Sequence, residues 1–297
     1  LQGIPRPAAG TPDGLPAPDM GAYELTPFHF VAPGGGHVWP FLTWADAAND
    51  LQAAIDAADA LDAVLVSNGV YNAGGRTHLG ALTNRVVVDK AIRVASVNGR
   101  AATVIEGAGP IGDAAVRGVY LGSNACLAGF TVRAGATRAA GDAVLDQSGG
   151  GVWCAPGALV SNCAVKFNAA QAFGGGAYGG RLVNVLVAAN GAGQAGGGVA
   201  RGEIAFCTVA NNGATDGGGA FETTGTASIV YYNGAAGSGS NVLGGAWDSC
   251  CVFPDPGGPG HVTNEPAFLA PPGDYRLAPG SPCIDAGANL GSPFDMA

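Results

Sequence analysis

The sequence predicts an all-β fold, a right-handed parallel β-helix (solenoid) with a short N-terminal capping helix. Three observations lead to this prediction: glycine triplets recur every 21–25 residues, an alternating apolar segment follows each triplet, and each segment ends at an asparagine. Self-similarity at a period of 20–50 residues is typical of solenoids, in which each repeat contacts only its neighbours.

The glycine triplets stand at 149–151, 174–176, 196–198 and 217–219. Glycine adopts backbone angles that a Cβ would forbid, so the triplets indicate turns between short strands. A phosphate-binding loop would need a helix directly after the glycines, and the following residues predict none.

The alternating segments predict strands. In CAVKFN, the period of two places Cys163, Val165 and Phe167 on one face of the strand. We expect the first residue of each segment to contribute to one inward column: Cys163, Val185, Cys207, Ile229 and Cys250. Stacked at about 4.8 Å, such side chains would form a continuous core.

An asparagine ends each segment, and these stand 21 or 22 residues apart: Asn168, Asn190, Asn212 and Asn233. Asparagine tolerates left-handed backbone angles, and its side-chain amide can hydrogen-bond to an equivalent amide above and below. We therefore expect a ladder of turn asparagines with a structural role.

The chain divides into four expected segments: 1–25, a closing-motif tail that packs on a neighbouring unit; 26–62, a linker and capping helix; 63–253, the β-helix coils; and 254–297, a C-terminal closing segment. The helix is expected to start after Thr43 and to run to about Ala60, with Leu51, Ile55 and Ala58 on its apolar side. A lateral loop is expected between Arg133 and Gly149, where one coil is longer than the others.

Charge and hydropathy exclude two classes of partner. The chain has 13 Lys+Arg and 22 Asp+Glu, a formal net charge of −9, so no basic stripe is present to neutralise the phosphates of a nucleic acid. No apolar run approaches the roughly 18 residues that a membrane span requires.

The seven cysteines show no spacing typical of a zinc site, and no metal or cofactor is predicted. Several are expected to be small buried apolar residues. One disulfide between the adjacent Cys250–Cys251 pair and Cys283, with Cys251 as the candidate partner, would suit an oxidising extracellular site.

Several segments resemble bacterial extracellular repeats of the pectin-lyase-like β-helix superfamily: DLQAAIDAADALDAVLVSNGVYNAGG, NRVVVDKAIRVASVNG, TVIEG and NEPAFLAPPGDYRLAPGSPCIDAG. The resemblance implies the fold and an extracellular or cell-surface location. It leaves the activity open, because the superfamily includes polysaccharide lyases, hydrolases, adhesins and passive surface spacers.

The closing motif is divided between the two ends of the chain. In the resembling proteins CIDAG is followed by DMGAYE, whereas here CIDAGANLGSPFDMA ends the chain and a segment containing DMGAYEL begins it. We expect one unit of a tandem or head-to-tail array, joined to its neighbour either through a peptide bond in a longer polypeptide or by non-covalent assembly. The alternative is a tail that belongs to an unrelated preceding domain. The expected assembly residues are Ile4, Met20, Tyr23, Leu25, Ile284 and Phe294.

Two groups of residues are candidates for a polysaccharide contact. Tyr120, Trp153 and Tyr178 align in consecutive coils, where they would either stack under sugar rings or pack within the fold. The second group, which follows successive glycine triplets, would form a site or a solvated ion-pair ladder: Arg181, Arg201 and Glu222.

The favoured function is an extracellular structural repeat that assembles head to tail as a surface fibre or stalk, with copies of itself as partners. A polysaccharide lyase or glycoside hydrolase and a non-catalytic glycan-binding adhesin are the alternatives. A lyase would require clustered Arg or Lys and carboxylates in a lateral groove, which the sequence does not indicate.

Overall fold

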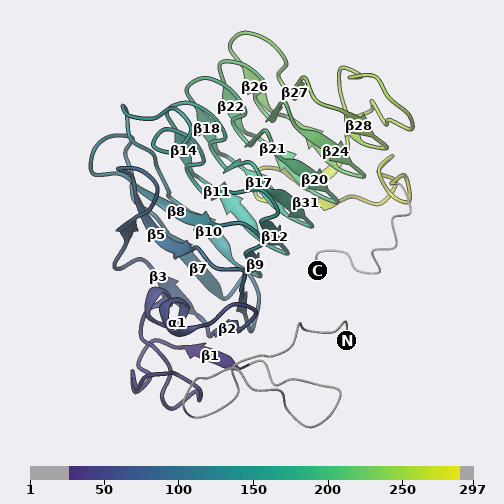
Figure 1. The fold of residues 1–297 in the computed structure, drawn as a ribbon. Coiled ribbons are helices and arrows are strands. Elements are labelled where there is room, and N and C mark those ends of the chain that lie inside the picture. Colours follow the sequence, from purple (N-terminus) through teal and green to yellow (C-terminus); the bar gives the residue numbers. More distant parts are fainter. Residues whose placement is uncertain (1–26, 288–297) are drawn as a thin grey trace.

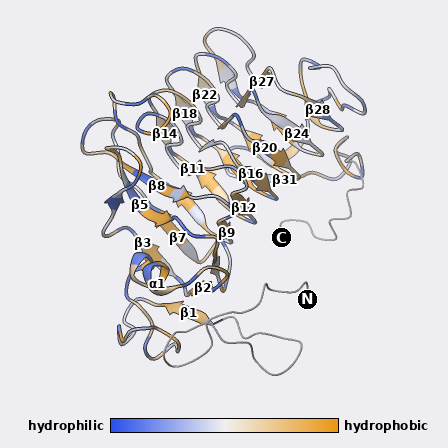
Figure 2. Ribbon diagram, viewed as in Figure 1, coloured by the Kyte–Doolittle hydropathy of each residue, from blue (hydrophilic) through white to orange (hydrophobic). Residues whose placement is uncertain are grey.

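The computed structural model describes residues 27–287, which form a parallel β-helix (Figure 1). Three long sheets run along the stack, and successive coils contribute one strand to each of them; four of the coils add a strand to a fourth, short sheet. Figure 2 shows hydrophobic residues on most of these strands. The predicted 1–25 tail, with Ile4, Met20, Tyr23 and Leu25, lies outside the described residues, as does Phe294.

Sheet A has nine strands in this order: β1 (Phe28–Val31), β2 (Ala63–Val66), β6 (Arg93–Ser96), β9 (Cys126–Ala128), β12 (Leu159–Ser161), β16 (Arg181–Val183), β20 (Glu203–Ala205), β24 (Thr224–Thr226) and β28 (Trp247–Asp248). Sheet B has eight: β3 (Gly69–Tyr71), β7 (Thr103–Glu106), β10 (Thr131–Arg133), β13 (Ala164–Lys166), β17 (Leu186–Ala188), β21 (Thr208–Ala210), β25 (Ile229–Tyr231) and β29 (Cys251–Val252).

Sheet C also has eight strands: β4 (Arg76–Thr77), β5 (Thr83–Val88), β8 (Val116–Leu121), β11 (Val152–Cys154), β15 (Ala177–Tyr178), β19 (Val199–Ala200), β23 (Ala220–Phe221) and β27 (Val242–Leu243). Sheet D has four: β14 (Ala169–Ala170), β18 (Gly191–Ala192), β22 (Gly213–Ala214) and β26 (Gly234–Ala235). Outside these sheets lie an antiparallel pair, β30 (Phe268–Ala270) and β31 (Asp274–Leu277), and one helix, α1 (Leu51–Ala57).

The inward column at the start of the sheet B strands contains most of the predicted residues. Cys163, Val185, Cys207 and Cys250 are each at most 2% exposed. The prediction for Ile229 is wrong by one residue, because Ile229 pairs with Thr208. Ser228 occupies the column instead, where its hydroxyl donates to the Thr226 carbonyl and accepts from the Cys207 backbone N–H.

Phe167 also departs from the predicted alternation. Its φ of 60° places it in a left-handed turn after β13, and its side chain is 62% exposed, whereas Val165 is fully buried. The strand ends at Lys166, so the period of two no longer applies to the next residue.

The asparagines lie in single file at the turn between sheets B and D, and all four are buried. The Nδ2 of Asn168 donates to Oδ1 of Asn190, Asn190 donates in the same way to Asn212, and Asn212 donates to Asn233, each at 2.9 Å. The file continues to Asn241 at 3.1 Å, a member that the sequence period does not reveal.

The helix is shorter than predicted. Thr43 forms a turn with Asp46, while the N-cap is Asp50, whose carboxylate accepts from the Ala53 N–H at 2.8 Å. Ala58 is already extended, so the helix ends before Ala60. At this C-terminal end the Nζ of Lys90 donates to three carbonyl groups, of Ile55, Asp56 and Ala58.

The solenoid begins earlier than residue 63, because β1 pairs in parallel with β2 along four residues. At the other end, the closing segment (residues 254–287) folds back on the coils. Val252 and Val262 are joined by a 2.9 Å backbone hydrogen bond, and the hydroxyl of Tyr275 accepts from the Asn211 amide at 2.8 Å. No described helix is long and apolar enough to cross a membrane.

The asparagine file gives a testable consequence for stability. Replacing Asn190 by Ala leaves the Asn168 N–H, the Val165 carbonyl and the Asn212 amide oxygen without side-chain partners in a buried turn. We expect Asn190→Ala to lower the free energy of unfolding by roughly 2–4 kcal/mol, measured by chemical denaturation.

The matched control is Asn184→Gly. Asn184 makes one exposed side-chain bond to Asn162 and has a φ of 56°, which glycine also adopts. We expect a loss below about 1 kcal/mol for this variant. Equal losses for the two variants would contradict a special role of the buried file.

Candidate functional site

The outer face of sheet C carries the aromatic residues singled out in the sequence. Val152, Ala177 and Val199 are fully buried, so the next residue of each strand points outward. The register of the strands aligns one outward column: Tyr120, Trp153, Tyr178, Ala200, Phe221 and Leu243.

The first three rings of this column form a stack. The Tyr120 and Trp153 centroids are 4.9 Å apart with 7° between the planes, and the Trp153 and Tyr178 centroids are 6.1 Å apart with 17°. The lateral loop (residues 134–148) covers part of the stack, since Trp153 Nε1 donates to the Val144 carbonyl at 3.0 Å and Leu145 packs against the cluster that contains these rings. The His78 ring lies on the other end, with its centroid 4.5 Å from that of Tyr120. Tyr120 is 3% and Trp153 9% exposed, so neither ring can stack under a sugar. Of the three aromatic residues, Tyr178 remains the candidate for a sugar contact.

A buried arginine holds the lateral loop in place. The Arg117 guanidinium donates to Asn84 Oδ1 and to the carbonyls of Leu145, Ser148 and Gly149, at 2.5–2.9 Å. Burial lowers the pKa of Arg117 to about 9, against a smaller opposing effect of the nearby Asp146 carboxylate. These carbonyls point at one guanidinium, whose planar fork can reach all of them.

The two aspartates of the loop are engaged with backbone groups. Asp146 accepts from the N–H groups of Ala81 and Leu82, and Asp142 accepts from those of Val144 and Leu145. Burial opposes ionisation of Asp146, but the backbone donors outweigh it and the pKa of this carboxyl is lowered. Both carboxylates therefore stabilise the loop.

Tyr178 belongs to a partly exposed group of side chains that we call the Arg201 cluster: Phe173, Tyr178, Arg201, Phe221 and Glu222. Nε of Arg201 is 2.8 Å from Glu222 Oε2, and the Arg201 guanidinium lies 4.9 Å from the Phe173 ring centroid. Hydrogen bonds with the Tyr178 hydroxyl and the Glu222 carboxylate raise the pKa of Arg201.

The structure separates Arg181 from this cluster. Arg181 begins β16 on sheet A, where it pairs in register with Glu203 rather than with Arg201. Gly179 and Gly180 both have positive φ and turn the chain from sheet C to sheet A before Arg181 is reached. The expectation that Arg181 joins Arg201 and Glu222 in one site or one ion-pair ladder is therefore wrong for Arg181, while Arg201 and Glu222 do pair.

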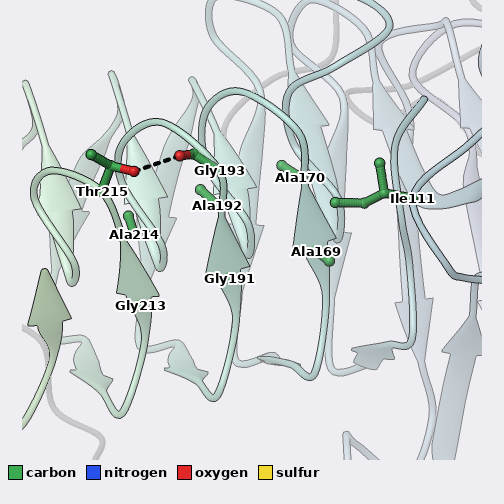
Figure 3. Close-up of a pocket in the computed structure, with 9 residues that line it drawn as sticks. All are labelled: Ile111, Ala169, Ala170, Gly191, Ala192, Gly193, Gly213, Ala214 and Thr215. Atoms are coloured by element: carbon green, nitrogen blue, oxygen red, sulfur yellow. Dashed lines mark hydrogen bonds between the residues drawn. The ribbon is translucent and has the colours of Figure 1, made fainter. Parts of the chain in front are cut away.

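A shallow groove of about 440 Å³ runs over sheet D (Figure 3). Its lining contains no titratable side chain: Ile111, Ala169, Ala170, Gly191, Ala192, Gly193, Gly213, Ala214 and Thr215. The Thr215 hydroxyl donates to the Gly193 carbonyl at 2.7 Å. This groove offers neither an acid nor a base for catalysis.

In the Arg201 cluster, the two charged side chains are paired with each other, which limits the chemistry that they can perform. Glu222 is held by Arg201, and within residues 27–287 no three His, Cys, Asp or Glu side chains gather closely enough to hold a metal ion. The Arg201 cluster can donate hydrogen bonds and present aromatic ring surface, which suits binding of a polar ligand better than bond cleavage.

Sequence reasoning missed Phe173 and Phe221, although a signal for both is present. Phe173 directly precedes the triplet at 174–176. Phe221 stands two residues after the triplet at 217–219, the position that Tyr178 holds after 174–176. Alignment of all residues relative to the triplets would have placed Phe221 in the outward column.

Similarity to known proteins is found among solved structures, at low sequence identity. No protein-family model and no curated protein sequence matches the chain. The structure is similar to that of pectate lyase Pel9A (TM-score 0.49, 15% identity), over 77% of this chain and 60% of the lyase. It is also similar to a pectin methylesterase from carrot (TM-score 0.41, 13% identity), over 83% of this chain and 88% of the esterase. The chain thus spans 60% of the length of the pectate lyase.

Substitution of the buried Arg117 tests whether its guanidinium holds the lateral loop in place. A lysine ammonium at position 117 has three donors on a single atom and cannot reach four divergent acceptors. We expect Arg117→Lys to lower the free energy of unfolding by about 2–4 kcal/mol and to increase hydrogen exchange in the lateral loop.

Arg76→Lys is the matched control, because Arg76 pairs with Asp56 at a site where both side chains are 39–48% exposed. Such a surface pair contributes at most about 1 kcal/mol. Unchanged exchange in the lateral loop of Arg117→Lys would show that the guanidinium does not hold it.

Proposed function

We propose that this β-helix is a non-catalytic structural unit that stacks end to end with further copies of itself outside the cell. The observation that supports this most is a group of exposed apolar side chains in the loop after β1, the first strand of the stack: Val38, Trp39, Leu42 and Trp44. These side chains are 43–72% exposed within a seven-residue stretch. Apolar side chains gathered in this way are typical of protein interfaces.

The fold directs these side chains outward. The loop after β1 runs along the free edge of that strand: Phe30 donates to the Phe41 carbonyl and accepts from the Ala48 N–H, both at 2.8 Å. The backbone groups at this edge are therefore paired, and contact with a neighbour would be made by side chains rather than by addition of a strand.

The opposite end supplies a different surface. Sheets C and D end at β27 and β26, and no strand of the described chain pairs with their far edges. Phe253, just after β29, is 56% exposed. A contact between unlike ends is heterologous, so its repetition would generate an open filament rather than a closed dimer.

The side surfaces of the solenoid, over sheets C and D, also support a structural role. The groove over sheet D lacks titratable groups, and two of the three stacked rings, Tyr120 and Trp153, are buried. The resemblance of the sequence to bacterial extracellular repeats supports the proposed location.

Stacking can be tested by native mass spectrometry and electron microscopy over a range of concentrations. We expect concentration-dependent linear arrays for the wild type and monomers for Trp39→Glu, because the variant places a charge in the contact. Phe167→Glu is the control, since Phe167 is 62% exposed on the flank. A wild type that stays monomeric at high concentration, or equal effects of both variants, would rule the proposal out.

Glycan binding without catalysis is the second candidate, and the exposed Arg201 cluster favours it. Arginine donors beside aromatic rings are suited to the hydroxyl and carboxylate groups and the apolar faces of sugars. Because the Glu222 carboxylate is already paired, a lyase or hydrolase has less support than a binding protein.

This second function can be tested with acidic and neutral polysaccharides, with and without calcium. If the cluster binds glycan, Arg201→Ala should weaken the binding at least about tenfold, the equivalent of 1.4 kcal/mol, while Arg76→Ala should leave it unchanged. Release of unsaturated or reducing sugar ends that Arg201→Ala abolishes would instead indicate an enzyme. Equal binding by the wild type and Arg201→Ala would exclude this site.

A further inference from the structure

The seven cysteines are free thiols in different surroundings. Cys154, Cys163 and Cys207 lie in the core, and burial raises the pKa of each of these thiols to about 12. Thiols in such apolar surroundings are inert, because the thiolate is the reactive form. These three are therefore packing residues.

Cys251 and Cys283 differ from the others because they lie close enough for each thiol to shift the pKa of the other. Cys251 lies on β29 next to Cys250, and successive strand residues face opposite sides. Cys250 is in the core column, so Cys251 faces outward, beneath the closing segment. Its thiol also donates to the Asn264 carbonyl at 3.4 Å.

Contacts independent of the thiols hold the two cysteines together. On one side, Val262 is bonded through its backbone to Cys250 and Val252, which fixes the closing segment along β29. On the other, the Ser281 hydroxyl donates to the Pro266 carbonyl and accepts from the Cys283 N–H. The proximity of the thiols is thus a result of the backbone arrangement.

We propose that Cys251 and Cys283 form an intramolecular disulfide that ties the closing segment to the last coil. This pairing selects Cys251 over its neighbour Cys250, whose thiol donates to the Asp248 carbonyl. The disulfide would close a loop of 33 residues, which includes β30 and β31 and lies against Asn211 and Tyr232.

The order of the reaction follows from the asymmetry of the pair. Cys283 is half-buried whereas Cys251 is only 4% exposed, so a small disulfide in solution reaches Cys283 first. The neighbouring Cys251 thiol also lowers the pKa of Cys283, which favours Cys283 as the first nucleophile. Its thiolate attacks one sulfur of a low-molecular-weight disulfide and releases one thiolate. Cys251 then loses its proton and its Sγ attacks the Cys283 sulfur, which releases the second thiolate. The two cysteines lose two electrons and the small disulfide gains them.

The Cys251–Cys283 disulfide would change how the closing segment opens. In the reduced protein this segment is held by hydrogen bonds and by ring contacts such as that of Phe268 with Tyr232, 6.1 Å between centroids. A covalent link removes most of the conformational freedom that opening would gain. Local opening, rather than global unfolding, is therefore the process that should respond most.

The experiment is oxidation of the purified protein with oxidised glutathione, followed by non-reducing peptide mapping and limited proteolysis. We expect a peptide linked through Cys251 and Cys283, and cleavage within residues 254–287 at least about tenfold slower than in the reduced protein. Cys126→Ser, which removes a half-buried thiol on sheet A, should behave like the wild type.

Two variants test the order of the steps. Cys251→Ser should retain glutathione on Cys283, whereas Cys283→Ser should leave residue 251 unmodified, and both should lose the protection from cleavage. Circular dichroism of each variant confirms that the coils are folded. A crosslink from Cys283 to Cys250, a stable glutathione adduct on wild-type Cys283, or equal cleavage of the oxidised and reduced wild type would overturn the proposal. None of these outcomes depends on end-to-end stacking.

Discussion

The buried file of asparagines is the interaction on which the rest of the structure depends. Each Oδ1 from Asn190 to Asn233 accepts two hydrogen bonds from the preceding coil, one from a backbone N–H and one from an amide. Backbone groups at a buried turn need such partners, because water cannot reach them. A slip of one residue would break the file and would also turn the apolar column outward. The file therefore sets the register of the coils from Val132 to Asn241, from which the core and the outward columns of that part follow.

This register forces ordinary residues into left-handed turns. The residue directly before each of the first four asparagines of the file has a φ between 55° and 60°: Phe167, Ala189, Asn211 and Tyr232. A left-handed backbone costs roughly 1–2 kcal/mol per non-glycine residue, so the packing and hydrogen bonds of each coil must offset that penalty. The exposed Phe167 ring is thus a result of the turn, and its exposure alone does not indicate a binding site.

The asparagine file and part of the core column could be predicted from the sequence, because successive coils need the same turn residue and the same inward apolar side chain. The asparagines and most of the core column follow from the period. The error at Ile229 arose from counting forward from the first apolar residue of its segment. Counting back five residues from Asn233, as Cys163 stands before Asn168, places Ser228 in the column. A serine is tolerated there because its hydroxyl donates a hydrogen bond to the Thr226 carbonyl. The sequence period does not reveal this contact.

The candidate site was less predictable, because its side chains meet across corners of the coil. Tyr178 and Arg181 are three residues apart, but the turn at Gly179 and Gly180 sends them to different sheets. The lateral loop and the closing segment cover further parts of the flanks, and those contacts are not periodic. What a ligand or a neighbouring copy can reach is therefore decided by the irregular segments, while the repeats supply the frame. The concentration of exposed apolar residues in the irregular segment after β1 is then meaningful, since no repeat requires them there.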